Sequence, residues 1–144
     1  MALSQAEAED LISMPKRFAG NQAVGGLLRG ARFVYELESM TTQDRFLLDL
    51  HRGDIRLTRH TMQERTKGDL LLVRLDIDGR PHTNPDGTPV GRTHLHVYRE
   101  GYDLKWAWPI DPGCFRDVTN AATALADFLS ICNIQPPQVQ NVLL

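Results

Sequence analysis

The sequence has few cysteines and no long apolar run. Only two cysteines occur, Cys114 and Cys132, and neither belongs to a CxxC pair, so a disulfide framework is not expected. No window approaches the roughly 20 apolar residues that a membrane helix needs, and the N-terminus lacks the basic and apolar stretches of a secretory signal. We therefore expect reduced thiols and a soluble, cytoplasmic protein that makes no membrane contact.

A strong charge of either sign is also missing. The net charge is -2 and the pI is near 6.2, which argues against a protein that nucleic acid wraps over much of its surface. The charge is nevertheless uneven, because residues 51–67 hold five basic side chains against only Asp54 and Glu64. This segment keeps a local anion-binding site open as a hypothesis.

Size and composition predict one globular domain. With 144 residues and 16.2 kDa, the chain has enough material for a single core, so residues 1–144 are expected to form one domain. The content of 42% hydrophobic and 24% charged residues is ordinary for a soluble protein. Disorder along the whole length is therefore not expected.

The N-terminal part predicts a helix. Ser4 and Glu7 have the spacing of a capping box, and good helix formers follow until Pro15, which should end or kink the helix. We expect a helix over residues 5–14, within an N-terminal helical unit of residues 1–18.

A second helix is expected near the other end of the chain. Apolar residues recur there at helical spacing, which predicts an amphipathic helix over residues 117–133. Residues 134–144, with two adjacent prolines, should form an extended tail. The glycine-rich residues 19–31 should form a loop, with at most a short helical turn over residues 24–28.

The middle of the chain predicts a sheet. Tight turns join several short aliphatic and aromatic runs, which indicates an antiparallel meander. The expected fold is therefore α+β, with a mostly antiparallel sheet of five to six strands over residues 32–110 and a helix from each end packed on it. The candidate strands are residues 32–38, 45–52, 55–62, 69–77, 93–99 and 104–110.

Alternation divides the predicted sheet into two faces. One parity in each strand is apolar and should form the core, and the other is rich in side chains that titrate or bind anions. The predicted core face includes Phe33, Ile55, Leu57, Trp106 and Trp108. The predicted polar face comprises Asp49, His51, Arg56, Thr58, His60, Arg74, Asp76, His94, His96, Tyr98 and Lys105.

The polar face predicts acid/base chemistry. His94, His96 and Tyr98 stand two residues apart, so on an extended strand they point to the same side. Two histidines with pKa values near neutrality can exchange protons with a 2′-hydroxyl or a water, while a cation holds the developing negative charge. The catalytic candidates are His94, His96, Tyr98 and His82, and the candidates for binding phosphate are Arg56, His60, Arg74 and Lys105.

The same histidines allow two other interpretations. They could share a metal ion with a third ligand from His82, Asp76 or Asp86, but no cysteine has ligand spacing and no HExxH helix occurs, so neither a metal nor another cofactor is predicted. They could also be surface histidines that form hydrogen bonds with neighbouring carboxylates. The Asn-Pro-Asp-Gly sequence of residues 84–87 predicts a turn in either case. In a functional site this turn would hold His82 near the other histidines.

The motifs also carry a resemblance. The segments starting at Arg74, His82, His94 and Lys105 resemble a small bacterial family with a pattern of the form RLDxxGxxHxNPDG, HLHxYREGY and KWA. The resemblance covers roughly residues 45–133. It implies a domain of unknown function found in bacteria and mobile elements, in which these positions form a common site.

Three functions follow as hypotheses. The leading one is a small nucleic-acid-directed protein of the toxin or mobile-element kind, acting as a metal-independent ribonuclease on RNA. The alternative is a non-catalytic module, such as an inhibitor encoded by a phage or mobile element, whose polar face docks on a protein partner. The third is a metal-dependent hydrolase built on His82, His94 and His96.

Overall fold

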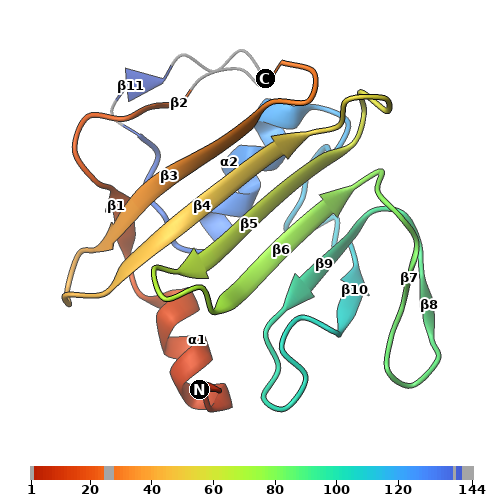
Figure 1. The fold of residues 1–144 in the computed structure, drawn as a ribbon, viewed down its shortest axis with the longest axis horizontal. Coiled ribbons are helices and arrows are strands. Elements are labelled where there is room, and N and C mark those ends of the chain that lie inside the picture. Colours follow the sequence, from red (N-terminus) through yellow and green to blue (C-terminus); the bar gives the residue numbers. More distant parts are fainter. Residues whose placement is uncertain (1, 25–27, 138, 141–144) are drawn as a thin grey trace.

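The sheet has seven strands and is antiparallel throughout. In a computed structural model that describes residues 2–24, 28–137 and 139–140, the strand order is β1-β3-β4-β5-β6-β9-β10 (Figure 1). The predicted α+β class is confirmed, although the sheet has more strands than the five to six expected. The strands are β1 (Lys16–Phe18), β3 (Arg32–Ser39), β4 (Arg45–Arg52), β5 (His60–Thr66), β6 (Leu71–Ile77), β9 (His94–Val97) and β10 (Ala107–Pro109).

Two helices and two small ribbons complete the fold. Helix α2 (Ala121–Ile131) lies behind the sheet in Figure 1, and α1 (Gln5–Ser13) lies at one end of it. Strands β7 (His82–Thr83) and β8 (Pro89–Val90) form a hairpin beyond β9, and β2 (Ala23–Val24) pairs in parallel with β11 (Val139–Gln140). No helix among the described residues is long and apolar enough to cross a membrane.

Most of the predicted elements are present with small changes at their ends. Strand β4 coincides with the predicted residues 45–52, and α1 ends one residue earlier than predicted. Helix α2 begins at Ala121 and not at residue 117, because the side chain of Asn120 accepts a hydrogen bond from the backbone N–H of Thr123 (3.0 Å) and so caps the helix there. Of the helical turn predicted at residues 24–28, Val24 belongs to β2 and residues 25–27 lie outside the described chain.

The strand predicted over residues 55–62 is wrong in position. Strand β5 begins only at His60, because the preceding residues turn. The backbone N–H of Gly53 donates to the carbonyl of Arg59 (2.8 Å), which closes this turn. The chain therefore needs five more residues than expected before it pairs again.

This shift reverses the faces of the strand. Met62 and Glu64 point into the core, whereas Ile55 and Leu57, expected there, are exposed, Ile55 to 96%. Because successive side chains of a strand alternate, Thr61 and Gln63 take the polar face instead. His60 shares the parity of Met62 and so leaves the polar face on which it was predicted.

The predicted core position of the tryptophans is also wrong. Trp108 pairs with Leu95 across β9 and β10, but this lies at the edge of the sheet and the side chain is 42% exposed. Trp106 precedes β10 and is half-buried, with the guanidinium of Arg99 lying 4.7 Å from its ring centroid. Phe33, near the start of β3, is likewise partly exposed.

The core lies between the sheet and α2. Leu125, Phe128 and Leu129 of the helix are buried in one cluster with Leu48 and Leu75 of the sheet. Each such side chain contributes roughly 1.5–3 kcal/mol when it is removed from water. This burial fixes α2 to one face and leaves the opposite face free for polar side chains.

Strand β1, which was not predicted, brings a charged pair into this core. The side chains of Lys16 and Glu64 are fully buried, with Nζ and Oε2 3.0 Å apart. The Lys16 ammonium also donates to the carbonyls of Leu11 (2.7 Å) and Ile12 (2.8 Å) at the end of α1. Burial raises the pKa of Glu64 to about 7, and the neighbouring Lys16 opposes this rise. The pair therefore joins α1, β1 and β5 in one contact.

Replacing this lysine should strongly destabilise the fold. Lys16→Met leaves a carboxyl group and two helix-end carbonyls buried without their donor, so we expect a loss of about 3–5 kcal/mol in the free energy of unfolding. Urea denaturation measures this, with Lys67→Met as the exposed control. A loss below about 0.5 kcal/mol would show that the pair does not hold these elements together.

Candidate functional site

Strand pairing aligns polar side chains on the face of the sheet opposite α2. His94 of β9 is the register partner of Asp76 of β6, and Asp76 is the partner of Thr61 of β5. In the neighbouring row, His96 is the partner of Arg74. Because such partners have Cβ atoms roughly 4.5–5.5 Å apart, the register alone gathers these groups.

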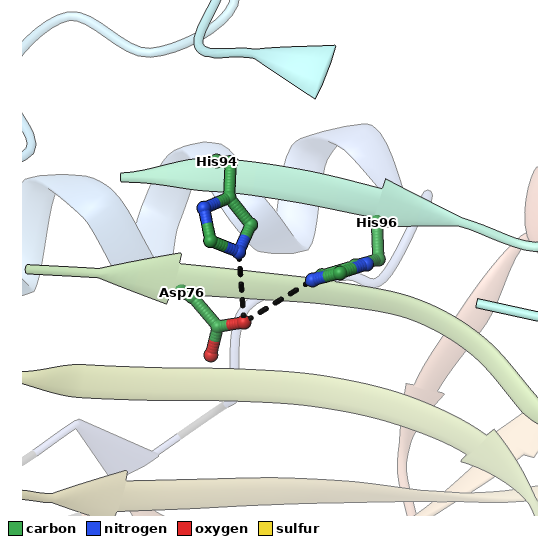
Figure 2. A group of neighbouring side chains, drawn as sticks. All are labelled: Asp76, His94 and His96. Atoms are coloured by element: carbon green, nitrogen blue, oxygen red, sulfur yellow. Dashed lines mark ion pairs between the residues drawn. The ribbon is translucent and has the colours of Figure 1, made fainter. Parts of the chain in front are cut away.

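Asp76, His94 and His96 converge on one point (Figure 2). Oδ2 of Asp76 lies 3.3 Å from Nε2 of His94 and 3.4 Å from Nε2 of His96. One ligand atom from each residue lies within 4.8 Å of the other two. All three residues are buried, with exposed fractions of 7%, 2% and 8% respectively. Among the described residues, this is the one group of three with the spacing of a metal site.

Backbone carbonyls fix the tautomer of both histidines. Nδ1 of His94 lies 2.7 Å from the carbonyl oxygen of Gly91, and Nδ1 of His96 lies 2.6 Å from that of Leu104. A carbonyl oxygen only accepts hydrogen bonds, so each Nδ1 must carry the proton and donate. Nε2 of each ring then faces the same carboxylate oxygen. This atom holds a lone pair in the neutral imidazole and donates to the carboxylate in the imidazolium.

Asp76 is an anion despite its burial. Burial alone would raise its pKa, but the hydrogen bond with His96 and the charge and hydrogen bond of Arg74 outweigh this and lower the pKa to about 2. Arg74 Nε (3.0 Å) and the Thr61 hydroxyl (3.2 Å) both donate to Oδ1. These contacts hold Oδ1 and leave Oδ2 directed at the histidines.

The lone pair of the neutral His94 faces the ionised Asp76, and a cation between these two atoms would attract both. Burial, the largest effect, lowers the pKa of His94, so this imidazole is neutral at pH 7 and presents a bare Nε2 to Asp76. The observed nitrogen–oxygen separations match a metal site, since ligands at about 2.0–2.1 Å from a tetrahedral Zn²⁺ lie roughly 3.3–3.4 Å from each other. Metal-binding histidines also typically donate their second N–H to a carbonyl or carboxylate, as both do here.

A third histidine covers the pair. The ring centroid of His82, on the β7–β8 hairpin, lies 4.8 Å from that of His96 and 5.7 Å from that of His94. Its Nε2 lies 2.7 Å from the carbonyl oxygen of Lys105 and must donate to it, so Nδ1 is the free acceptor. His82 is half-buried, and its ring contacts the rings of both clustered histidines.

The hairpin is positioned by Asn84, which sequence reasoning treated only as part of a turn. Its side-chain amide donates to the carbonyl of Ala107 (3.0 Å) and accepts from the N–H of the same residue (2.9 Å). These two hydrogen bonds engage the backbone of Ala107 as a neighbouring strand would, and they fix the hairpin to β10. The signal in the sequence was its Asn-Pro-Asp-Gly context, which does not specify this partner.

The other predicted site residues lie apart from this cluster. Tyr98 is buried against the N-terminal segment, where its hydroxyl donates to the carbonyl of Leu3 (2.5 Å). Arg56 forms an ion pair with Asp78 (2.7 Å) in the turn before β5. His60 lies on the α2 side of the sheet, and the side chain of Lys105 is exposed. Of the predicted phosphate-binding residues, only Arg74 contacts the cluster.

The chain belongs to a family of unknown function, DUF6978, whose family model matches residues 3–134. The match includes both helices, all seven strands of the main sheet and the three clustered residues. The predicted membership of a family of unknown function is therefore confirmed, over more of the chain than residues 45–133. No curated protein and no solved structure shows a significant match.

Removing the Asn84 amide should release the hairpin. Asn84→Ala leaves the N–H and carbonyl of Ala107 buried without partners, which costs about 1–3 kcal/mol. We expect faster hydrogen exchange at the Ala107 N–H and loss of the nuclear Overhauser contacts between His82 and His96. Asp86→Ala, an exposed change in the same hairpin, is the control, and unchanged contacts in Asn84→Ala would contradict the assigned role.

Proposed function

We propose that this protein is a metal-dependent hydrolase that holds a divalent transition-metal ion between Asp76, His94 and His96. One observation carries the proposal, namely that two Nε2 atoms and an ionised carboxylate oxygen face one another in a buried site. Two histidines and one carboxylate form a common ligand set for Zn²⁺ and for non-haem Fe²⁺. Asp76 is one of the three third ligands that the sequence left open, whereas the hydrolase hypothesis was built on His82.

This ligand set suits hydrolysis because it leaves coordination positions free. All three ligands come from β6 and β9, so they bind the ion from one side. A water on the remaining side would have its pKa lowered by the metal and would supply a nucleophile at neutral pH. The Nδ1 lone pair of His82 is the available acceptor for its proton.

The geometry favours this proposal over a metal-independent ribonuclease. Two histidines acting alone would have to reach the substrate with a protonated and an unprotonated nitrogen. Here His94 is almost fully buried, and one nitrogen of each imidazole is committed to a backbone carbonyl. A non-catalytic docking module would require none of these buried contacts.

Metal binding should depend on the three ligands. Native mass spectrometry and calorimetry with Zn²⁺ should show one bound ion per chain. Asp76→Asn and His94→Ala should each weaken the affinity at least about 100-fold. His60→Ala removes a histidine from the opposite face and should bind Zn²⁺ as the wild type does. Equal binding by all four proteins would place the ion elsewhere, and no binding would refute the site.

Hydrolysis should require both the ion and His82. With Zn²⁺ or Mn²⁺ added, we expect turnover of p-nitrophenyl acetate or bis(p-nitrophenyl) phosphate that chelator abolishes. His82→Ala should retain Zn²⁺ and lower kcat about 100-fold, the loss typical of a missing acid/base group. Absence of metal-dependent turnover with either substrate would count against the hydrolase, whereas metal binding would be judged separately.

A further inference from the structure

A groove of about 620 Å³ lies beside the proposed metal centre, over β3 to β6. The register row of Asp76 continues through Thr61 to His51, and both of these residues line the groove. Arg74 is also part of the lining, and because it donates to Asp76, the groove and the proposed metal centre share this side chain. A volume of this size is typical of a site for a small molecule.

The charged residues of the lining are mostly positive. One carboxylate and four arginines line the groove, namely Asp49 and Arg32, Arg59, Arg65 and Arg74. The carboxylate is already occupied, since Arg65 donates to both of its oxygens and Gln63 donates to one of them. Asp49 therefore does not neutralise the other arginines.

Two of these arginines have no counter-charge. Arg65 is bound by Asp49 and Asp69, and Arg74 is bound by Asp76. Within the described part of the chain, neither Arg32 nor Arg59 has an ion-pair partner. The groove thus contains two guanidinium groups whose charge is not compensated.

The turn before β5 fixes the position of Arg59. Its carbonyl accepts from the N–H of Gly53 (2.8 Å), and its own N–H donates to the carbonyl of Arg56 (3.0 Å). A Cβ at Gly53 would collide with the Arg56 carbonyl, so this turn requires glycine. The side chain of Arg59 extends toward Gly79, where an added Cβ would lie 3.8 Å from its Nε and 3.7 Å from Cβ of Asp76. The turn therefore places this guanidinium close to Asp76.

The pKa of His51 reflects the same positive charge. Burial is the main cause that lowers this pKa, and the charges of Arg32, Arg59 and Arg74 lower it further. Three guanidinium groups therefore lie close enough to act on one side chain within the groove. An anion placed among them would replace their mutual repulsion with attraction.

The charge of the lining fits a phosphate group better than other common anions. Arg32 and Arg59 leave two positive charges uncompensated, and a phosphomonoester carries a charge of about −1.5 to −2 at neutral pH. A carboxylate or a phosphodiester carries only one negative charge. The guanidinium group also matches phosphate in shape, because its planar fork donates two parallel hydrogen bonds to two oxygens.

We propose that this groove is a binding site for a dianionic phosphate group, held by the guanidinium groups of Arg32 and Arg59. The rest of its volume accommodates the organic part of a phosphomonoester. Binding at this site needs neither a metal ion nor turnover. The inference therefore goes beyond the proposed hydrolase and is tested separately from it.

Calorimetry on protein stripped of metal with a chelating resin tests the site. At a pH of about 8, phenyl phosphate and inorganic phosphate are dianions, and each should bind at least about 10-fold more tightly than the singly charged dimethyl phosphate. The tighter of the two dianions identifies whether the group is bound as an ester or as the free ion. Arg32→Gln/Arg59→Gln should bind both at least about 10-fold more weakly, because it loses charge-assisted hydrogen bonds.

The control variant carries the same loss of charge away from the groove. Arg17→Gln/Lys67→Gln removes two exposed cations that do not line it and should bind both dianions as the wild type does. Equal weakening in both double variants, equally tight binding of dimethyl phosphate, or no saturable binding of either dianion would overturn the proposal. Since no metal is present, a failed metal site does not affect these results.

Discussion

Each face of the sheet buries a carboxylate, and the need to compensate these charges organises the molecule. On the α2 side, Glu64 is compensated by the ammonium of Lys16, which also caps α1. On the opposite side, Asp76 receives an arginine and a hydroxyl at Oδ1, but two imidazoles at Oδ2. The first pair is complete as it stands, whereas the second leaves a place that a cation fits. This contrast is the physical reason for assigning a structural role to the Lys16–Glu64 pair and a chemical role to the Asp76 cluster.

The sequence was sufficient for the parts of the fold that follow local rules. The capping box fixed the start of α1, and alternation identified β4 and the two histidines of β9. It was insufficient for β5. Ile55 and Leu57 have the spacing of a strand, but the strand that forms buries the ionisable Glu64 on its core side. Only the Lys16 partner, 48 residues away, makes that burial acceptable.

In the candidate site too, some features follow from local sequence rules and others depend on contacts between distant residues. The spacing of His94 and His96 predicted that both side chains lie on one face of the sheet. The tautomers of the two rings depend on the carbonyls of Gly91 and Leu104, and no sequence motif predicts these contacts. Asp76 becomes their partner through register across β6 and β9, which is a property of the folded sheet. Tyr98 has the right parity, yet the strand ends at Val97 and its hydroxyl turns to the N-terminal segment.

The central claim is that Asp76, His94 and His96 hold a metal ion. The most direct measurement is anomalous X-ray diffraction from crystals grown with Zn²⁺, recorded on both sides of the zinc absorption edge. The account predicts one strong anomalous peak about 2.0–2.1 Å from Asp76 Oδ2 and from both Nε2 atoms. A peak bound elsewhere, or none with the histidines left in their present positions, would contradict it.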